Sequence, residues 1–284
     1  MSSSPTNVAR RWARTGLVAF VALIAAAGLA ACAPSDPEPP ELDTEAAPAP
    51  LPEEPAEESV EEPAPAPLDG RLIAIDPGHN GGNFDAPDEI AREVDAGPET
   101  KRCNTVGAVA DDGYRESRFN IELARRLRAM LEARGAEVVM TREDDDGVGP
   151  CIDERGTFGQ DTGADLMISI HADGAAEDGH GFHVIRPGGW EGQSEEVVER
   201  SSRLATQVRD HLVNYGLTPS NYVGEDGIHV RSDLGTLNLS EVPAVLLEAG
   251  NMHNDDDLAM LRSNEGQDAL GAALADAIEH YLDG

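Results

Sequence analysis

The sequence predicts one α/β domain, and three kinds of segment support this prediction. Residues 72–76 form a short Ile-rich apolar run that ends in a Pro-Gly turn, as a buried strand does. Pro243–Gly250 is a nearly continuous apolar run, which is typical of a strand covered on both faces. Other segments carry apolar residues at helical spacing. The stretch from about Asp69 to Gly284 has a suitable length for a single domain of this class.

The N-terminal segment is expected to be an export signal. Arg10, Arg11 and Arg14 precede the apolar run Gly16–Ala31, which is too short and too alanine-rich for a membrane span. The run ends in Leu-Ala-Ala-Cys32, which resembles a bacterial lipobox in which the cysteine is acylated. An ordinary cleaved signal with a chance cysteine is the alternative. Residues 1–32 are therefore interpreted as a lipoprotein-type signal peptide, and the rest of the chain as exported.

A strongly acidic segment separates this signal from the domain. Residues 33–68 consist almost entirely of Pro, Glu, Ala and Asp, with 11 acidic residues and no Lys or Arg. This composition predicts a disordered, extended tether, because it offers little apolar surface to bury. The whole chain has a net charge of −33, and most of that excess lies in the domain itself. Nucleic acid is therefore not expected as a partner, because the domain would repel phosphates.

The three cysteines fit an exported protein. With Cys32 assigned to the lipid, Cys103 and Cys151 form an even pair, which predicts a disulfide in an oxidising compartment. Both lie in polar, loop-like sequence, so the bridge is expected to staple a long surface excursion. Two free thiols and a cysteine-ligated metal are the alternatives. They are less favoured, since no second cysteine stands at ligand spacing.

The first predicted strand and helix each carry a candidate functional residue. His79 follows the strand at the Pro-Gly turn, and ligands of open α/β sheets bind at this carboxyl edge. Glu116 stands at the entrance of the amphipathic segment Ser117–Leu131, where exposed amides favour a carboxylate; a first-turn residue without further function is the alternative. Gly135 ends this helix. Its apolar face contains Phe119, Leu123, Leu127 and Leu131.

Two further strand ends carry polar side chains. The predicted strand Ala164–Ile170 is followed by His171, and the strand Pro243–Gly250 terminates in Glu248. A charge at the end of a buried strand is seldom structural. The remaining predicted elements are strands at Ala136–Thr141 and Gly181–Arg186, a helix at Ser194–Tyr215 with Val198, Leu204, Val208 and Leu212 inward, and a helix at Glu265–Leu282.

These positions together suggest a metal site. His79, His171 and a glutamate supply two imidazoles and a carboxylate, the ligand set of a catalytic zinc ion with one open position. A fourth group, a glutamate kept off the metal, suits a general base. No short motif such as His-Glu-x-x-His is present, so scattered polar strand ends remain the alternative.

The same stretches resemble those of the zinc-dependent N-acetylmuramoyl-L-alanine amidases of type 3, above all the compact actinobacterial members. The resemblance covers essentially all of Leu72–Leu282. Its motifs are Ile75-Asp76-Pro77-Gly78-His79, the helix-opening Glu116, Ser169-Ile170-His171-Ala172, and Leu247-Glu248-Ala249-Gly250-Asn251 through Asn254.

The resemblance implies both a site and a fold. His79, Glu116 and His171 would bind one zinc ion (Zn2+) per domain, and Glu248 would be the catalytic carboxylate. The implied fold is a single, mostly parallel central sheet of about six strands flanked by helices, a phosphorylase/hydrolase-like amidase fold. The implied activity is hydrolysis of the amide bond between the lactyl group of N-acetylmuramic acid and L-alanine of the stem peptide.

Some positions depart from the family pattern. Asn80 stands where the family commonly has glycine, Asp173 where it has asparagine, and Asn251 where it has an aromatic residue. We expect these changes to affect the groove walls and substrate preference, not the metal. The segment Ala172–Gly181 is too short for an inserted autoinhibitory helix, which predicts a groove open without an activator.

The expected partners are peptidoglycan or muropeptides, in the cell envelope outside the cytoplasm. Contact with the membrane would occur only through a lipid anchor at Cys32, and a monomer is expected. Asp173, Arg231 and Asn254 are predicted groove contacts, with a structural role as the alternative for each. Another zinc peptidoglycan peptidase or carboxypeptidase is a rival function. A non-catalytic wall-binding lipoprotein is a second rival, although a binding module has no need of Glu248.

Overall fold

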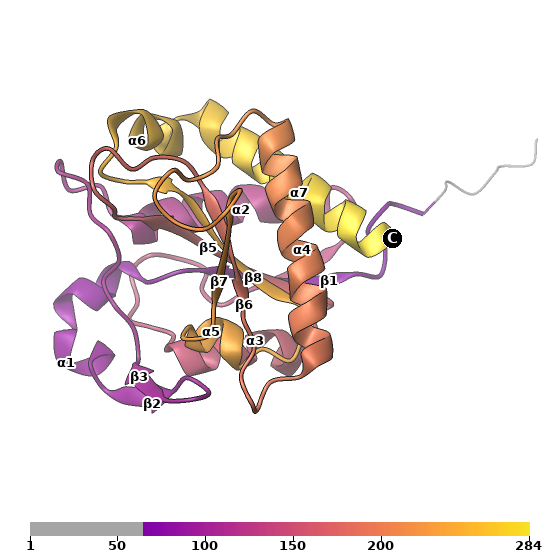
Figure 1. Cartoon of the computed structure of the whole chain (residues 1–284), viewed down its shortest axis with the longest axis horizontal. Coiled ribbons are helices and arrows are strands. Elements are labelled where there is room, and N and C mark those ends of the chain that lie inside the picture. Colours follow the sequence, from indigo (N-terminus) through magenta and orange to yellow (C-terminus); the bar gives the residue numbers. More distant parts are fainter. Residues whose placement is uncertain (1–64) are drawn as a thin grey trace, which may run out of the picture. The chain divides into compact units, whose positions relative to one another are not determined.

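A six-stranded sheet forms the centre of the part of the chain that the computed structural model describes, residues 65–284 (Figure 1). Its strands are β1 (Leu72–Pro77), β4 (Glu137–Met140), β5 (Leu166–Asp173), β6 (His183–Pro187), β7 (Ile228–Arg231) and β8 (Ala244–Asn251). The spatial order is β4-β1-β5-β8-β6-β7. The first four run parallel, whereas β6 is antiparallel to β8 and parallel to β7. The expected mostly parallel sheet of about six strands is confirmed.

Helices cover both faces of this sheet. One face is covered by α2 (Glu116–Glu132), α4 (Glu195–Asn214), α6 (Asp255–Arg262) and α7 (Asn264–Asp283), and the other by α3 (Ile152–Thr162) and α5 (Gly235–Asn238). Each face has its own apolar core, and the larger one lies under α2, α4 and α7. Figure 1 shows α3 and α5 together on the side of the sheet away from α2 and α7. Among residues 65–284, no helix combines the length and the apolar character needed to cross a bilayer.

The amphipathic helices form where the apolar spacing predicts them. The four apolar residues of α2 that the sequence places on one face, from Phe119 to Leu131, are all fully buried. In α4, Leu204, Val208 and Leu212 are also buried as expected. The expectation for Val198 is wrong, because its neighbour Val197 takes the inward position and Val198 is only half-buried.

Several elements are not expected from the sequence, among them the helix α3 and the strand β7. In α3 the glycines hide the helical pattern, and the structure gives the reason for them. A Cβ atom at Gly156 would lie 2.8 Å from the Cβ of Leu239 and 2.9 Å from the carbonyl oxygen of Gly235. A glycine is therefore needed for α3 to pack closely against α5.

The chain between β1 and α2 leaves the sheet and forms a small lobe. Its elements are the 3-10 helix η1 (Gly81–Asp85), the short helix α1 (Pro87–Ile90) and the hairpin of β2 (Glu93–Asp95) and β3 (Thr100–Arg102). A disulfide between Cys103 and Cys151 joins the end of this hairpin to the start of α3. The bridge joins the two cysteines that the sequence pairs, and it fastens the lobe that leaves the sheet. Both cysteines are buried, because they pack against Val94 and Ile152 in a small apolar cluster.

The domain begins slightly earlier than expected. Leu68, which the composition assigns to the tether, is fully buried in the larger core, and its amide donates a hydrogen bond to the carbonyl of Arg134 at 2.9 Å. The predicted signal peptide, its lipobox cysteine Cys32 and the tether up to residue 64 lie outside the described residues.

Candidate metal centre

Three of the predicted side chains converge at the carboxyl ends of the parallel strands. His79 follows β1, Glu116 is the first residue of α2, and His171 lies in β5. The Oε1 atom of Glu116 is 3.2 Å from Nε2 of His79 and 2.8 Å from Nδ1 of His171. One ligand atom from each residue falls within a group whose members are all within 4.8 Å of one another. The alternative of scattered polar strand ends does not hold for these three residues.

Hydrogen bonds around the centre orient its donors for a cation. Nδ1 of His79 donates a hydrogen bond to the carbonyl of Thr105 at 3.0 Å, which directs Nε2 toward the carboxylate of Glu116. This contact needs a positive charge between the nitrogen and the carboxylate, which either a proton on Nε2 or a metal ion can supply. Two imidazoles and one carboxylate also match the donor set of a zinc site with an open position. The residues present therefore fit a divalent metal ion.

Glu116 is held by backbone amides as well as by the histidines. Its Oε2 accepts a hydrogen bond from the amide of Ala108 at 2.7 Å, and its Oε1 accepts one from the amide of Ala172 at 3.2 Å. Burial alone would raise the pKa of Glu116, but the charge of His79 and the hydrogen bonds from both imidazoles outweigh it. The pKa of Glu116 is consequently held well below its usual range, so the carboxylate is ionised.

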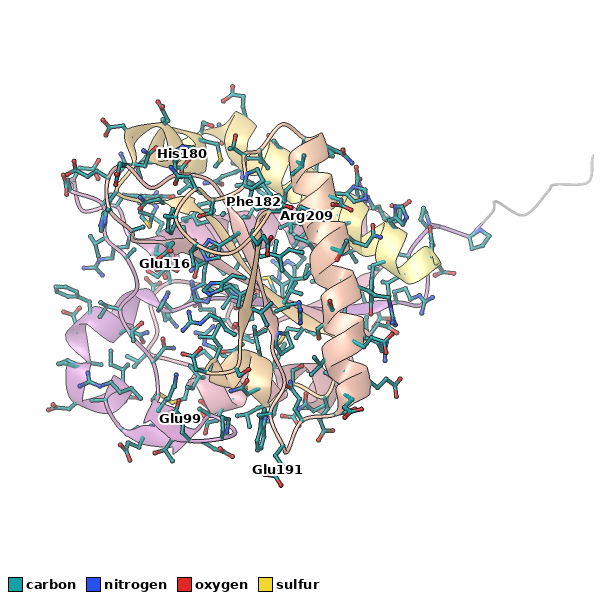
Figure 2. The ribbon with its side chains drawn as sticks, viewed as in Figure 1. Glu99, Glu116, His180, Phe182, Glu191 and Arg209 are labelled. Atoms are coloured by element: carbon teal, nitrogen blue, oxygen red, sulfur yellow. A yellow bond between two sulfur atoms is a disulfide. The ribbon has the colours of Figure 1, made fainter. Side chains whose placement is uncertain are left out.

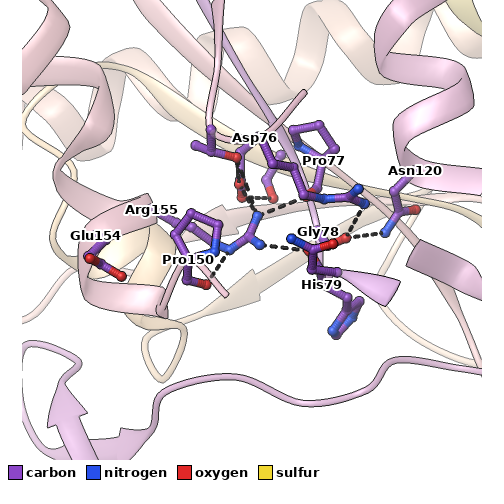
Figure 3. Close-up of polar contacts among 12 residues, drawn as sticks. Asp76, Pro77, Gly78, His79, Asn120, Pro150, Glu154 and Arg155 are labelled. Atoms are coloured by element: carbon purple, nitrogen blue, oxygen red, sulfur yellow. Dashed lines mark hydrogen bonds and ion pairs between the residues drawn. The ribbon is translucent and has the colours of Figure 1, made fainter. Parts of the chain in front are cut away.

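The loop that carries His79 is fixed by two buried arginines. Arg155 of α3 donates to the carbonyl groups of Pro77 (2.8 Å) and His79 (2.7 Å), and pairs with Asp76 at 2.5 Å (Figure 3). Arg142 donates to the same Pro77 carbonyl at 2.9 Å. These bonds hold His79 in a left-handed backbone conformation, with φ of 57°, which a residue other than glycine seldom adopts.

Gly78 in this loop allows the two histidines to meet. A Cβ atom at Gly78 would lie 2.1 Å from Cε1 of the His171 ring, so no larger residue fits without moving a ligand candidate. The carbonyl of Gly78 also accepts hydrogen bonds from Asn120 (3.1 Å) and Arg142 (3.0 Å). The ring centroids of His79 and His171 are 4.8 Å apart in an edge-to-face arrangement.

Glu248 lies beside this group, but inside its strand and not at the end. β8 continues to Asn251, and Glu248 pairs in register with His171 of β5. The expected strand end is therefore wrong for both residues, because Asp173 and Asn251 continue the pairing beyond them. Oε2 of Glu248 has no hydrogen-bond partner among residues 65–284.

The surroundings of Glu248 favour its neutral form. Burial is the main cause, and the charges of Glu116 and Asp173 add to it, so the pKa of Glu248 is held well above its usual range. The positive charge of a metal ion at the centre would act in the opposite direction. A buried carboxyl group with a raised pKa and a carboxylate oxygen free of hydrogen bonds is suited to take up and release a proton.

Two histidines to which the sequence analysis gives no role lie next to Glu248, on the side of it away from His171. His183 of β6 pairs in register with Glu248, and register partners point to the same face of a sheet. His229 of β7 continues the row, with its ring centroid 5.7 Å from that of His183. The Nδ1 atoms of both rings are buried and have no partner among the described residues. The row consists of His171, Glu248, His183 and His229. Only the strand register reveals it, because the four residues lie on four different strands.

The centre lies between two cavities that share His79, Thr105 and His171. The first has a volume of about 390 Å³ and extends under the β2–β3 hairpin toward α5. The second has a volume of about 450 Å³ and is lined by Glu116, Glu248 and the loop residues Gly174 and Val109, among others. A groove thus passes across the centre, as a substrate longer than one residue requires.

The predicted groove contacts have different locations. Asp173 lines the second cavity, where it accepts a hydrogen bond from the hydroxyl of Tyr222 at 3.0 Å. Arg231 instead makes a two-point ion pair with Asp233, at 2.9 and 2.7 Å. Asn254 caps α6 by accepting a hydrogen bond from the amide of Asp257. The structural alternative is therefore favoured for Asn254.

The other departures from the family pattern are buried and do not line the groove. Asn80 donates to the carbonyl of Gly149 at 3.0 Å. Asn251 is fully buried and donates to the carbonyls of Ala176 and Gly179, both at 2.7 Å. The expectation that these two residues form groove walls is wrong, because both amides satisfy loop carbonyls. Residues 174–182, which connect β5 to β6, contain no helix.

Known proteins are similar to this chain over most of its described length. Residues 73–280 match the family described as N-acetylmuramoyl-L-alanine amidase. The chain is 38% identical to the N-acetylmuramoyl-L-alanine amidase Rv3717 of Mycobacterium tuberculosis over 221 residues, 77% of this chain and 89% of that protein. Crystal structures of the N-acetylmuramyl-L-alanine amidase Ami1 are similar as well. The Mycobacterium smegmatis protein has a TM-score of 0.72 and 38% identity over 76% of this chain and 98% of its own. The Mycobacterium abscessus protein has a TM-score of 0.71 and 40% identity over 76% of this chain and 100% of its own.

Proposed function

The chain belongs to the N-acetylmuramoyl-L-alanine amidase family, and on this premise we propose that it hydrolyses the amide bond between the lactyl group of N-acetylmuramic acid and L-alanine of the stem peptide. His79, Glu116 and His171 hold a zinc ion in this proposal, and Glu248 is the catalytic carboxylate. The observation that carries the proposal is the convergence of the first three side chains beside Glu248, at the middle of a groove.

Each residue has a separate task in this reaction. The zinc ion, when bound, supplies a Lewis acid that polarises the scissile carbonyl and acidifies a water molecule. Glu248 accepts a proton from the attacking water and then transfers it to the leaving amine nitrogen of L-alanine. His183 and His229 border Glu248 on the side away from His171. The loop fixed by Arg142 and Arg155 keeps His79 in place while substrate enters and leaves.

We also infer that the protein works outside the cytoplasm on peptidoglycan or muropeptides. The signal-like residues 1–32 support export, and a buried disulfide supports an oxidising compartment. Lipid attachment at Cys32 would tie the acidic segment to the membrane and let the domain reach the wall. Residues 174–182 insert no helix between the strands that flank Glu248, which supports a groove open without an activator.

Product analysis tests this function. Purified protein loaded with zinc is incubated with muropeptides, and the products are identified by mass spectrometry. An amidase releases intact stem peptides that begin with a free L-alanine amine, together with glycan that retains its lactyl groups. Shortened stem peptides would indicate a zinc peptidase or carboxypeptidase instead. Unchanged substrate, with tight binding, would indicate a wall-binding protein.

A further inference from the structure

The two cavities on either side of the metal centre differ in charge. The residues that line the cavity under the hairpin include the cationic Lys101, Arg102 and Arg155 and a single carboxylate, Asp233. The opposite cavity is lined by three carboxylates and no Lys or Arg: Glu116, Asp173 and Glu248. A cationic wall is unexpected in a chain of net charge −33. An anionic part of a substrate would therefore be attracted to the hairpin cavity and repelled from the other one.

Two of these three cationic side chains already have carboxylate partners within the protein. Arg155 is buried and binds Asp76 and the carbonyls of the His79 loop. Lys101, the only lysine of the chain, contacts the carboxylate of Asp233 at 3.0 Å and that of Glu99 at 3.4 Å. Glu99 lies in the turn of the hairpin, well away from Glu116 of the metal centre in Figure 2.

Arg102 is the cation that is free to bind a ligand. Arg102 is exposed and is one of the residues that line the hairpin cavity, and its side chain makes no hydrogen bond or ion pair within the described part of the chain. Glu93, opposite it on β2, makes no ion pair with it and accepts a hydrogen bond from Thr100 at 3.4 Å. A guanidinium group binds carboxylates with two parallel hydrogen bonds, so Arg102 is suited to this class of group.

The backbone of Arg102 is fixed from two sides. The next residue, Cys103, is disulfide-bonded to Cys151 at the start of α3. On the other side, the ion pair of Lys101 with Asp233 ties the hairpin to the loop between β7 and α5. A binding group on a fixed strand loses less conformational freedom when it binds a ligand.

From this geometry we infer that the hairpin cavity receives the peptide side of the substrate and that Arg102 selects stem peptides with a free carboxylate. The inference rests on the proposed amidase function and adds a substrate preference to it. The cavity volume of about 390 Å³ suits one or two amino-acid residues beyond the scissile amide. The neutral sugar would then lie over the acidic cavity, where hydroxyl groups can donate to Asp173.

A matched pair of synthetic substrates tests this inference. Both are N-acetylmuramoyl-L-alanyl-D-glutamates, and they differ only in whether the glutamate carboxyl groups are free or converted to carboxamides. The zinc-loaded full chain should have a higher kcat/KM for the free acid. Arg102→Gln should lower kcat/KM for the free acid roughly five- to twenty-fold and leave the amide within about twofold. Arg102→Lys should restore part of the preference, because it keeps the charge.

Controls separate this inference from the proposed function. Arg203 is an exposed arginine on α4 that pairs with Glu199, and Arg203→Gln should leave both substrates unaffected. Binding of the product L-alanyl-D-glutamate, measured by calorimetry without turnover, should weaken in Arg102→Gln. Equal kcat/KM values of Arg102→Gln and wild type for the free acid would overturn the inference while the amidase function stands. Hydrolysis of neither substrate by the wild type would instead overturn the proposed function.

Discussion

Glu248 of β8 is the direct register partner of His171 of β5, in the parallel pair at the middle of the sheet. The two side chains therefore share one face and stand on neighbouring strands. This places the candidate base beside a candidate ligand through backbone hydrogen bonds alone. Their roles should nevertheless be separable by substitution.

Glu248→Gln should retain zinc and fold while losing turnover. The amide keeps the shape of the side chain but cannot accept a proton from water, so kcat should fall by about 10²–10⁴-fold. Glu116→Gln should behave differently and lose zinc affinity, because a neutral amide is a poor ligand for a dication. Zinc content by mass spectrometry and kcat in excess zinc distinguish the two. Loss of zinc in Glu248→Gln would show that Glu248 is a zinc ligand.

The metal should depend on His171. We expect about one zinc ion per domain in the wild type, and His171→Ala should lose metal and activity together. A chelator should abolish wild-type hydrolysis, and added zinc should restore it. His280→Ala, which alters an exposed histidine of α7, is the matched control and should keep its zinc. If His171→Ala retained about one zinc ion per domain, His171 would not be a zinc ligand.

Reduction of the disulfide should lower stability markedly. The bridge closes a loop with a sequence separation of 48 residues, which corresponds to about 4 kcal/mol in the chain-entropy account. Because both sulfur atoms are buried, alkylation must be tested in denaturant, on a Cys32→Ala background. We expect no alkylation before reduction, two labels after it, and a lower Tm for the reduced protein. Two labels without reductant would rule out the bridge.

Asp76 should make stability depend on pH in the acid range. Burial raises the pKa of Asp76, but the charge of Arg155 and the hydrogen bonds from Thr141 and Ser169 outweigh it, so the folded-state pKa lies below 3.8. Its contribution to the free energy of unfolding is therefore complete above about pH 4 and is lost as the pH falls further. Asp76→Asn should cost about 3 kcal/mol at pH 7, because buried Arg155 loses its partner.

Urea unfolding at pH 7 and pH 3 measures this contribution. The difference in stability between wild type and Asp76→Asn should shrink at the lower pH. Asp161→Asn changes an exposed carboxylate at the end of α3 and should show no such convergence. An unchanged difference at the two pH values would mean that the charge of Asp76 does not stabilise the fold.

Anchoring should depend on Cys32. If this cysteine is acylated, Cys32→Ala should move the protein from the membrane fraction to the soluble fraction without changing hydrolysis of muropeptides. Cell fractionation followed by immunoblotting with an antibody against the domain measures the shift. A protein that stays in the membrane fraction would show that the segment Gly16–Ala31 is itself the anchor.

The sequence predicts much of the sheet and of the site because both depend on local patterns. The Pro-Gly turn places His79 after β1, and the apolar run before Glu248 identifies β8 as a buried strand. The ends of β5 and β8 are less predictable. Polar residues such as Asp173 and Asn251 interrupt the apolar pattern, although backbone pairing continues through them.

Residues that act through backbone carbonyls are beyond sequence reasoning of this kind. Arg142 and Arg155 bind the carbonyls of the His79 loop from positions 65 and 76–78 residues away. A carbonyl acceptor has no signature in the sequence, so nothing distinguishes these arginines from solvated ones. The helix α3 is missed for a related reason, since its glycines reflect close packing against α5 and not a loop.

The position of β8 within the sheet has a consequence for how the protein matures. β8 is the last strand in the chain, yet it occupies the slot between β5 and β6, both of which precede it. The three candidate ligands can gather once β5 is in place, whereas the candidate base arrives only when β8 inserts. Such long-range pairing forms late and slowly. A chain truncated before β8 would therefore lack the candidate base, and we expect it to be inactive whether or not its candidate ligands hold a metal ion.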